Sequence, residues 1–492
     1  MMVAEGTGTT KKRRAISYYV HSVIVFLIMF VVGQLPPFGQ ITPLGMQILG
    51  IFVGVIYGWC TVSMVWPSLI GLIAIGSTDY CTITESFSLG FGDDLPLQIV
   101  AVYILGAYLE ESGLLRYLCN WFISRKIGEG RPWVFTSLIF LAAFILASLV
   151  SVFFTIIIMW GIFYEVCKVV GLEKRSKYVN MVMCGIVIIA GLSGALFPFK
   201  PFSLMIIGLV EKGVGAPVEI NFMAWTLYNT LLSLGFAICY MLIGRFIVRP
   251  DMTKVKEAGK VLAYLRNEKM NPNQKRAGFI FILFLLILII PSFFSKEIAF
   301  VAWLSNAGVL GATGVCITLL YFLNNEKGEP VVNLPTLMNK GISWEVVILI
   351  SATMPLAAAL EAPEIGVMAT VVPWMQSIFS SLSSTLFLVV FMAAFLIATQ
   401  FLHNLILMIV FTPLLVKMGL GFGLSPILIG ILIYFAAMTA YLTPAASSQA
   451  ALVFGNSEWI DRKAAFFWGG VVILVAFVVL IGIGIPLGQL FF

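Results

Sequence analysis

The chain has 492 residues, of which 60% are hydrophobic and only 11% are charged. Soluble proteins carry roughly 25% charged residues, so the composition excludes a soluble globular protein and indicates a polytopic membrane protein. The net charge of +6 is small and comes from basic residues that flank apolar segments, which does not point to nucleic acid as a partner. With only two histidines, no histidine-based metal site is expected.

Apolar runs of about 20 residues predict an all-α protein with about 11 transmembrane helices. The sequence Lys11 to Arg14 precedes the first run and carries no feature of a cleavable signal, which predicts a cytoplasmic N-terminus. In chain order the predicted helices lie near residues 17–35, 44–60, 64–78, 95–114, 179–209, 222–247, 277–294, 298–323, 344–361, 427–455 and 465–490.

Two further pairs of apolar runs are closely spaced, at 133–148 with 153–167 and at 373–397 with 405–416. If each pair is a re-entrant hairpin that does not cross the membrane, most basic residues fall on the side of the N-terminus, as the positive-inside rule requires. The exceptions are Lys200, Lys212, Lys296 and Lys417. The first hairpin would then enter from the cytoplasm and the second from outside.

This order of elements predicts an inverted repeat. The N-terminal tail and first helix cover residues 1–43, the first repeat 44–250, a cytoplasmic linker 251–276 and the second repeat 277–492. Each repeat has a helix interrupted by Gly, Pro or Ser in mid-span, at 189–203 and at 439–449. Freed backbone groups are tolerated at membrane depth only where they line a cavity, so paired broken helices are typical of a secondary transporter with a midplane site.

The motifs at these positions resemble those of the divalent anion/sodium symporter family of dicarboxylate transporters, within the wider ion-transporter superfamily. The second hairpin tip, Thr399-Gln400-Phe401-Leu402-His403-Asn404-Leu405, resembles Thr-Glu-Phe-x-Ser-Asn-Thr. The stretch from Ala446 to Gly455 resembles Ala-Thr-Pro-Pro-Asn-Ala-Ile-Val-Phe-Gly without a gap. In the first half, Ser151-Val152-Phe153 replaces Ser-Asn-Thr and Phe199-Lys200-Pro201-Phe202-Ser203 replaces Gly-Thr-Pro-Pro-Asn. The resemblance implies a small-carboxylate transporter.

Lys200 is the most informative single residue, because placing a lysine at mid-bilayer costs ~2.5–3.5 kcal/mol on insertion scales. Our hypothesis is that Lys200 is a tethered cation that replaces the first sodium ion of the family, or that neutralises an anionic substrate. The alternative is that Lys200 reaches an interface or pairs with a structural carboxylate.

The second half supplies most of the remaining candidates. The predicted substrate-binding residues are Asn404, His403, Ser447, Ser448, Thr443, Lys200 and Ser151. The family resemblance implies a possible sodium site at Thr399, Leu402, Asn404 and Ala446; no other cofactor is expected. His403 could couple transport to protons, or could be a packing histidine hydrogen-bonded to neighbouring backbone.

The function favoured by these patterns is secondary-active transport of a di- or tricarboxylate-like anion by an elevator-type mechanism. We expect a homodimer in the lipid of the plasma (inner) membrane, with a small anion as its substrate. A sodium-independent anion exchanger and a cation/proton antiporter remain alternatives. The predicted site contains Lys200 and no Asp or Glu, which disfavours the antiporter; Glu110 and Glu361 are interpreted as interface or scaffold residues. An intramembrane enzyme is disfavoured, because no paired acidic motif or metal-binding set is found.

Overall fold

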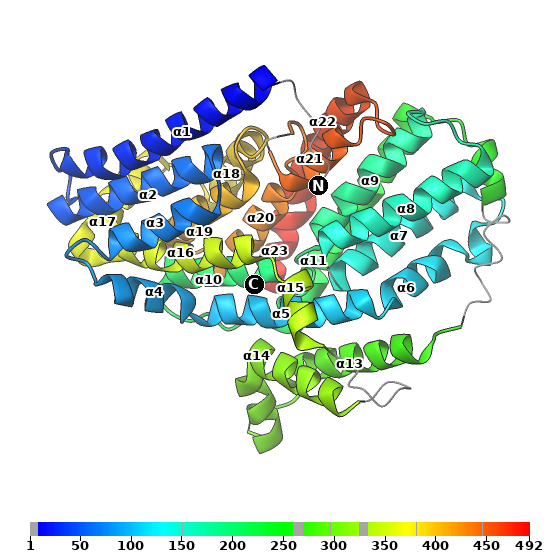
Figure 1. The fold of residues 1–492 in the computed structure, drawn as a ribbon, viewed down its shortest axis with the longest axis horizontal. Coiled ribbons are helices and arrows are strands. Elements are labelled where there is room, and N and C mark those ends of the chain that lie inside the picture. Colours follow the sequence, from blue (N-terminus) through cyan, green and yellow to red (C-terminus); the bar gives the residue numbers. More distant parts are fainter. Residues whose placement is uncertain are drawn as a thin grey trace.

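The computed structural model describes residues 8–149, 151–258, 269–295, 297–323, 333–379, 381–444 and 446–492. Over these ranges every regular element is a helix. Ten helices are long and apolar enough to cross a membrane, or up to twelve if each of two bent helix pairs is counted as one span. The predicted all-α polytopic fold is therefore confirmed (Figure 1).

The chain begins with two long antiparallel helices that pack on each other, and shorter helices follow them. In order they are α1 (Gly8–Val31), α2 (Pro43–Thr61), α3 (Val65–Ile75), α4 (Ile83–Phe91), α5 (Asp94–Glu111) and α6 (Leu114–Ile123). Helices α4 and α5 meet at a bend of 45°. The sequence did not predict α4 and α6, because they are short and carry polar residues on one face.

The first predicted hairpin and the first broken helix follow. The hairpin consists of α7 (Pro132–Leu149) and α8 (Val152–Val170), and the broken helix consists of α9 (Lys177–Ser193) and α10 (Pro201–Val214). Proline at the first position of α10 favours a new helix start there, since its fixed φ suits the first turn. Helix α11 (Phe222–Ile243) returns across the bundle and packs on α9.

The linker between the halves is described only in part, because residues 259–268 of the predicted 251–276 segment lie outside the described ranges. After it come α13 (Pro272–Ile289), α14 (Ala299–Phe322), α15 (Leu334–Gly341) and α16 (Trp344–Glu361). Helix α14 is kinked at Gly308, whose φ of 54° lies in the left-handed region that glycine adopts readily. Helices α13 and α14 pack on each other and on α5, at one edge of the molecule (Figure 1).

The second hairpin differs in detail from its prediction. The apolar run 373–397 is not one helix but two, α17 (Val367–Phe379) and α18 (Ser384–Ala398), with a bend of 109° between them. The side chain of Ser383 caps α18 by accepting a hydrogen bond from the N–H of Leu386, which starts a new helix within an otherwise apolar run. The hairpin is therefore α18 with α19 (Asn404–Gly421).

The chain ends with the second broken helix, formed by α20 and α21, and with one long span formed by α22 and α23. These are α20 (Pro426–Ala437), α21 (Ser448–Gly455), α22 (Arg462–Val479) and α23 (Ile485–Phe491). Helices α9 and α20 form the centre of the bundle, and all residues from Tyr178 to Ser193 and from Leu428 to Ala437 are buried. They are joined by the hydroxyl of Tyr434, which donates to the carbonyl of Gly191 at 3.2 Å. Two helices that are apolar all round are therefore buried all round, as expected.

Candidate functional site

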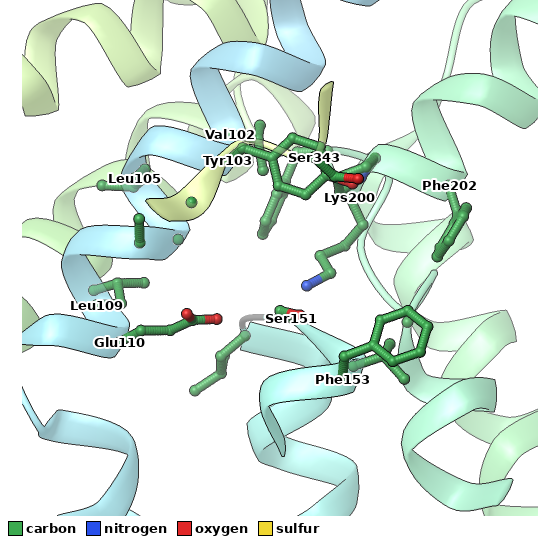
Figure 2. Close-up of a pocket in the computed structure, with 18 of the residues that line it drawn as sticks. Val102, Tyr103, Leu105, Leu109, Glu110, Ser151, Phe153, Lys200, Phe202 and Ser343 are labelled. Carbon is green, nitrogen blue, oxygen red and sulfur yellow. The ribbon is translucent and has the colours of Figure 1, made fainter. Parts of the chain in front are cut away.

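A cavity of about 230 Å³ lies beside the break between α9 and α10 (Figure 2). Its walls come from the C-terminal half of α5, the start of α8, the loop before α10, helix α13 and the junction of α15 with α16. The polar or charged side chains that line it belong to Tyr103, Glu110, Ser151, Lys200, Lys340 and Ser343. The rest of the lining is largely apolar, so these groups act on one another at low dielectric.

Lys200 occupies the N-cap position of α10 and is only 5% exposed. Its backbone is fixed by two hydrogen bonds, from its own N–H to the carbonyl of Phe197 at 3.2 Å and from the N–H of Leu204 to its carbonyl at 2.8 Å. Its side chain extends into the cavity, with the ammonium directed toward the wall formed by α5 (Figure 2). Lys200, the residue that the sequence analysis identified as most informative, therefore lines a cavity beside the interrupted helix.

Glu110 approaches from the opposite wall, near the end of α5 (Figure 2). Its carboxylate and the Lys200 ammonium attract each other, and the backbone N–H of Ser151 donates a hydrogen bond to the carboxylate. The expectation that the site around Lys200 contains no Asp or Glu is therefore wrong, and the alternative that Lys200 lies beside a carboxylate fits the structure. The sequence could not reveal this proximity, because Glu110 lies 90 residues before Lys200 along the chain.

A second cavity, of about 720 Å³, lies on the far side of Phe199. It is lined by the loop before α11 and by α10, α13 and α14, with Glu211 and Glu219 among its residues. Of the described lining residues, Phe199 is the one that both cavities share. Its ring stacks on Phe222 at 6.2 Å and meets Phe284 edge-on at 4.8 Å between centroids. An aromatic wall therefore separates the two cavities.

The second hairpin tip lies against the second broken helix, and Gln400 connects them. Its side-chain N–H groups donate to the carbonyls of Leu396 at 2.9 Å and Thr439 at 3.2 Å. Its side-chain oxygen accepts hydrogen bonds from the N–H groups of Tyr441 and Leu442, both at 3.1 Å. The amide thus satisfies backbone groups that the interrupted helix exposes, as a buried polar network must.

Asn404 and Ser447 belong to the same network. The N–H of Asn404 donates to the carbonyl of Ala446 at 3.0 Å, and its side-chain amide donates to the carbonyl of Ala437 at 3.3 Å. The hydroxyl of Ser447 donates to the carbonyl of Ala440 at 2.7 Å and caps α21. The predicted substrate-binding residues Asn404 and Ser447 therefore lie close together, and their side chains donate hydrogen bonds to backbone carbonyls.

The remaining candidates of the second tip differ in their surroundings. His403 is the N-cap of α19, and its Nδ1 accepts a hydrogen bond from the N–H of Leu405 at 3.4 Å. The hydroxyl of Thr443 donates to the carbonyl of Gln400 at 2.7 Å. The hydroxyl of Thr399 is buried and makes no hydrogen bond within the described residues. Leu402 is about half exposed, and Ser448 is the first residue of α21.

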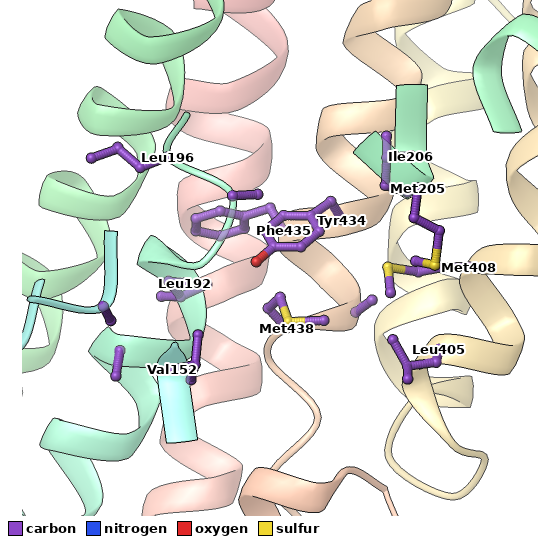
Figure 3. Close-up of a cluster of buried hydrophobic side chains, with 14 of the residues drawn as sticks. Val152, Leu192, Leu196, Met205, Ile206, Leu405, Met408, Tyr434, Phe435 and Met438 are labelled. Carbon is purple, nitrogen blue, oxygen red and sulfur yellow. The ribbon is translucent and has the colours of Figure 1, made fainter. Parts of the chain in front are cut away.

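An apolar layer lies between the two hairpin tips (Figure 3). Val152, which begins α8, and Leu405, which follows the second tip, belong to one buried cluster with Tyr434 and Met438. The described lining of the first cavity includes Ser151 and Lys200 but no residue of the second tip. The predicted site residues therefore fall into two groups, one at each tip.

Comparison with known protein families covers the first of these two groups of site residues. A family model described as "CitMHS: Citrate transporter" matches residues 48–377, which is more than half of the chain. The chain belongs to this citrate transporter family. It is therefore a multi-pass membrane transporter of citrate-like carboxylate anions, not an enzyme. The matched range includes Glu110, Ser151, Lys200 and Lys340 and ends before the second tip.

The fold of this CitMHS chain is similar to the crystal structure of the YdaH transporter of Alcanivorax borkumensis, which is described as having an unusual topology. The two share 15% sequence identity and a TM-score of 0.52, over 97% of this chain and 99% of the other. No curated protein sequence matches the chain. The prediction that the chain belongs to a family of carboxylate transporters is confirmed.

Proposed function

We propose that this CitMHS chain is a secondary-active transporter in which Lys200 binds one carboxylate of a citrate-like di- or tricarboxylate. The observation that carries this proposal is the buried Lys200 ammonium, which extends into a cavity within the part of the chain that the family matches. An ammonium in an apolar cavity forms a stronger hydrogen-bonded ion pair than one in water. The family resemblance adds the class of anion.

Glu110 gives this site a means of coupling. With no substrate bound, its carboxylate compensates the Lys200 charge, and an entering anion must compete with it. A proton on Glu110 removes the competitor and leaves the ammonium to the substrate. Transport would then carry a proton with each anion. A second coupling ion that we propose is sodium, bound at Thr399, Leu402, Asn404 and Ala446. The buried hydroxyl of Thr399 makes no hydrogen bond within the described residues, which supports an oxygen ligand there.

The testing experiment is citrate uptake into proteoliposomes, with sodium, potassium and pH gradients imposed one at a time. Lys200→Met is expected to reduce uptake by at least about 100-fold, since loss of a buried charge-assisted contact costs about 3 kcal/mol, while Lys200→Arg retains part of it. Lys212→Gln serves as the matched control, because Lys212 lies at the other end of α10 and outside the cavity. Near-normal uptake by Lys200→Met would refute the role of Lys200.

The alternative function is cation/proton antiport. The presence of the acidic Glu110 in the cavity lining supports it. An antiporter would use the carboxylate as the carrier of its cation, with Lys200 as the competing charge. The two functions differ in the transported species. Labelled citrate accumulates in the proteoliposomes only if the chain carries the anion, whereas an antiporter moves sodium or potassium against protons with no citrate present.

The movement that we propose is of the elevator type. The two hairpins, the two broken helices, α11 and α22 would form the moving body, and α2–α5 with α13–α16 the stationary one. Reciprocal packing supports an inverted repeat: α3 and α4 pack on α16, while α14 and α15 pack on α5. A homodimer in the plasma membrane with a cytoplasmic N-terminus remains a prediction, to be checked by cross-linking and by labelling from either side.

A further inference from the structure

The cavity contains a second lysine, which none of the sequence motifs pointed to. Lys340 lies near the end of α15 and lines the cavity together with Lys200. The two differ in burial, since Lys200 is 5% exposed whereas Lys340 is exposed. Lys200 is thus shielded from solvent, whereas Lys340 is accessible to it. They come from opposite halves of the chain.

Close packing fixes the backbone at Lys340. The neighbouring Gly341 is pressed onto α5, so that a Cβ atom there would lie 2.3 Å from the Cβ of Ala107 and 3.2 Å from the carbonyl oxygen of Tyr103. One residue beyond Ile342, the Ser343 hydroxyl shares a hydrogen bond with Tyr103 (Figure 2). The junction of α15 with α16 is therefore held on α5, which keeps Lys340 beside the cavity.

The charges of the lining residues suit an anion with more than one carboxylate. Two lysines and one glutamate are the charged residues of the described lining. Once Glu110 is neutral, the charged residues that line the cavity are two lysines, and its described lining carries a net positive charge. A monocarboxylate could pair with one of them, whereas a di- or tricarboxylate could pair with both.

We propose that Lys340 binds a second carboxylate of the substrate and thereby selects polycarboxylates over monocarboxylates. This inference rests on the proposed function, in which Lys200 binds the first carboxylate. The competing explanation is that Lys340 only balances the C-terminal carbonyls of α15 and the membrane surface charge. A residue with that structural role would affect stability, and would not change the relative affinity for two classes of anion.

The test measures binding of radiolabelled citrate to the purified full-length protein in detergent at low salt, with acetate as the competing monocarboxylate. Lys340→Gln is expected to weaken citrate binding on the order of five- to ten-fold, as loss of one partly exposed charge-assisted contact does. The inhibition constant of acetate should stay the same. Lys340→Arg should restore citrate binding. Lys275→Gln is the matched control, because Lys275 is exposed at the start of α13 and lies outside the cavity.

The outcomes separate this inference from the proposed function. If Lys200→Met abolishes citrate binding but Lys340→Gln leaves the ratio of citrate to acetate affinity unchanged, Lys340 has no role in selectivity and the proposed function stands. If wild-type protein binds no citrate, or Lys200→Met binds it normally, both proposals fail. Equal weakening by Lys340→Gln and Lys275→Gln would show a general charge effect and would also overturn the role of Lys340.

Discussion

Glu110 and Lys200 have opposite charges, and each occupies a position where it would be costly without the other. A charge removed from water is tolerated when a partner and hydrogen bonds compensate it. Here the Ser151 N–H and the Lys200 ammonium do so for Glu110. Since Ser151 lies at the tip of the first hairpin, one carboxylate connects α5, the hairpin tip and the broken helix. A change of its charge therefore affects three elements at once.

Neutralising this carboxylate permanently should remove the proton dependence of transport. If binding requires one proton on Glu110, citrate affinity of the wild type falls about ten-fold for each pH unit above its pKa. Glu110→Gln is expected to bind citrate with an affinity that is flat between about pH 7.5 and 8.5, where the substrate is fully ionised. The measurement is the citrate Kd across that range, with Glu111→Gln as the adjacent control. A parallel pH slope in wild type and Glu110→Gln would contradict the mechanism.

At the scale of elements, Gly208 of α10 packs directly on α5, which belongs to the other of the two proposed bodies. A Cβ atom on Gly208 would lie 1.9 Å from Cδ1 of Leu95, so any side chain there must displace Leu95. Overpacking of this kind costs about 1–3 kcal/mol. The absence of a side chain at Gly208 lets two helices that must slide on each other approach closely.

Gly208→Ala should therefore slow transport. The expected result is a maximal uptake rate several-fold lower, with the citrate Kd in detergent nearly unchanged, since Gly208 does not line the cavity. Gly278→Ala in α13 is the matched control, because an added Cβ there meets no atom within 4 Å. Both changes gain the same helix propensity, so a difference between them measures the contact with Leu95. Equal rates for both variants would argue against a sliding contact.

The sequence predicted the elements better than their contacts. Long apolar runs, the Pro198 to Pro201 break and the polar second tip were enough to predict both hairpins and both broken helices. The amphipathic helices α4, α6 and α15 were missed because charges divide their apolar residues. The pairing of Glu110 with Lys200 was missed because it depends on the crossing of α5 and α10, which no local pattern encodes. Gln400 belongs to the motif of the second tip, but its four backbone partners could not be predicted from the sequence.

At the scale of the whole molecule, two loops hold the halves of the proposed moving body together. The loop after α8 contacts the loop between α21 and α22 through a Lys174–Glu458 ion pair and a hydrogen bond from the Arg175 guanidinium to the carbonyl of Ser457. The ring of Tyr164 stacks on Trp459 at 4.4 Å. The N–H of Asp461 donates to the side-chain oxygen of Asn180 at 2.9 Å. These contacts predict that both halves move as one unit.

Cross-linking can distinguish this unit movement from a rocking of the two repeats. A short bifunctional reagent that joins cysteines at positions 174 and 458 is expected to leave citrate uptake intact, because these residues stay together. A bond between cysteines at positions 95 and 208 is expected to stop uptake, because it joins α5 to α10. Both pairs are introduced after the exposed Cys60 is replaced. Arrest by the first cross-link would show that the two repeats move relative to each other during transport.

The aromatic wall at Phe199 also has an electrical consequence. If the two cavities open to opposite sides of the membrane, water and ions carry the potential of each side inward, and most of the membrane voltage falls across the wall that separates the cavities. That separation is a layer of phenylalanine rings, and the Lys200 charge is attached at its edge. The free energy of an elementary charge that crosses such a field changes by about 2.3 kcal/mol per 100 mV of membrane potential. The transport cycle should therefore be driven or opposed by membrane voltage, according to the net charge that accompanies Lys200 across.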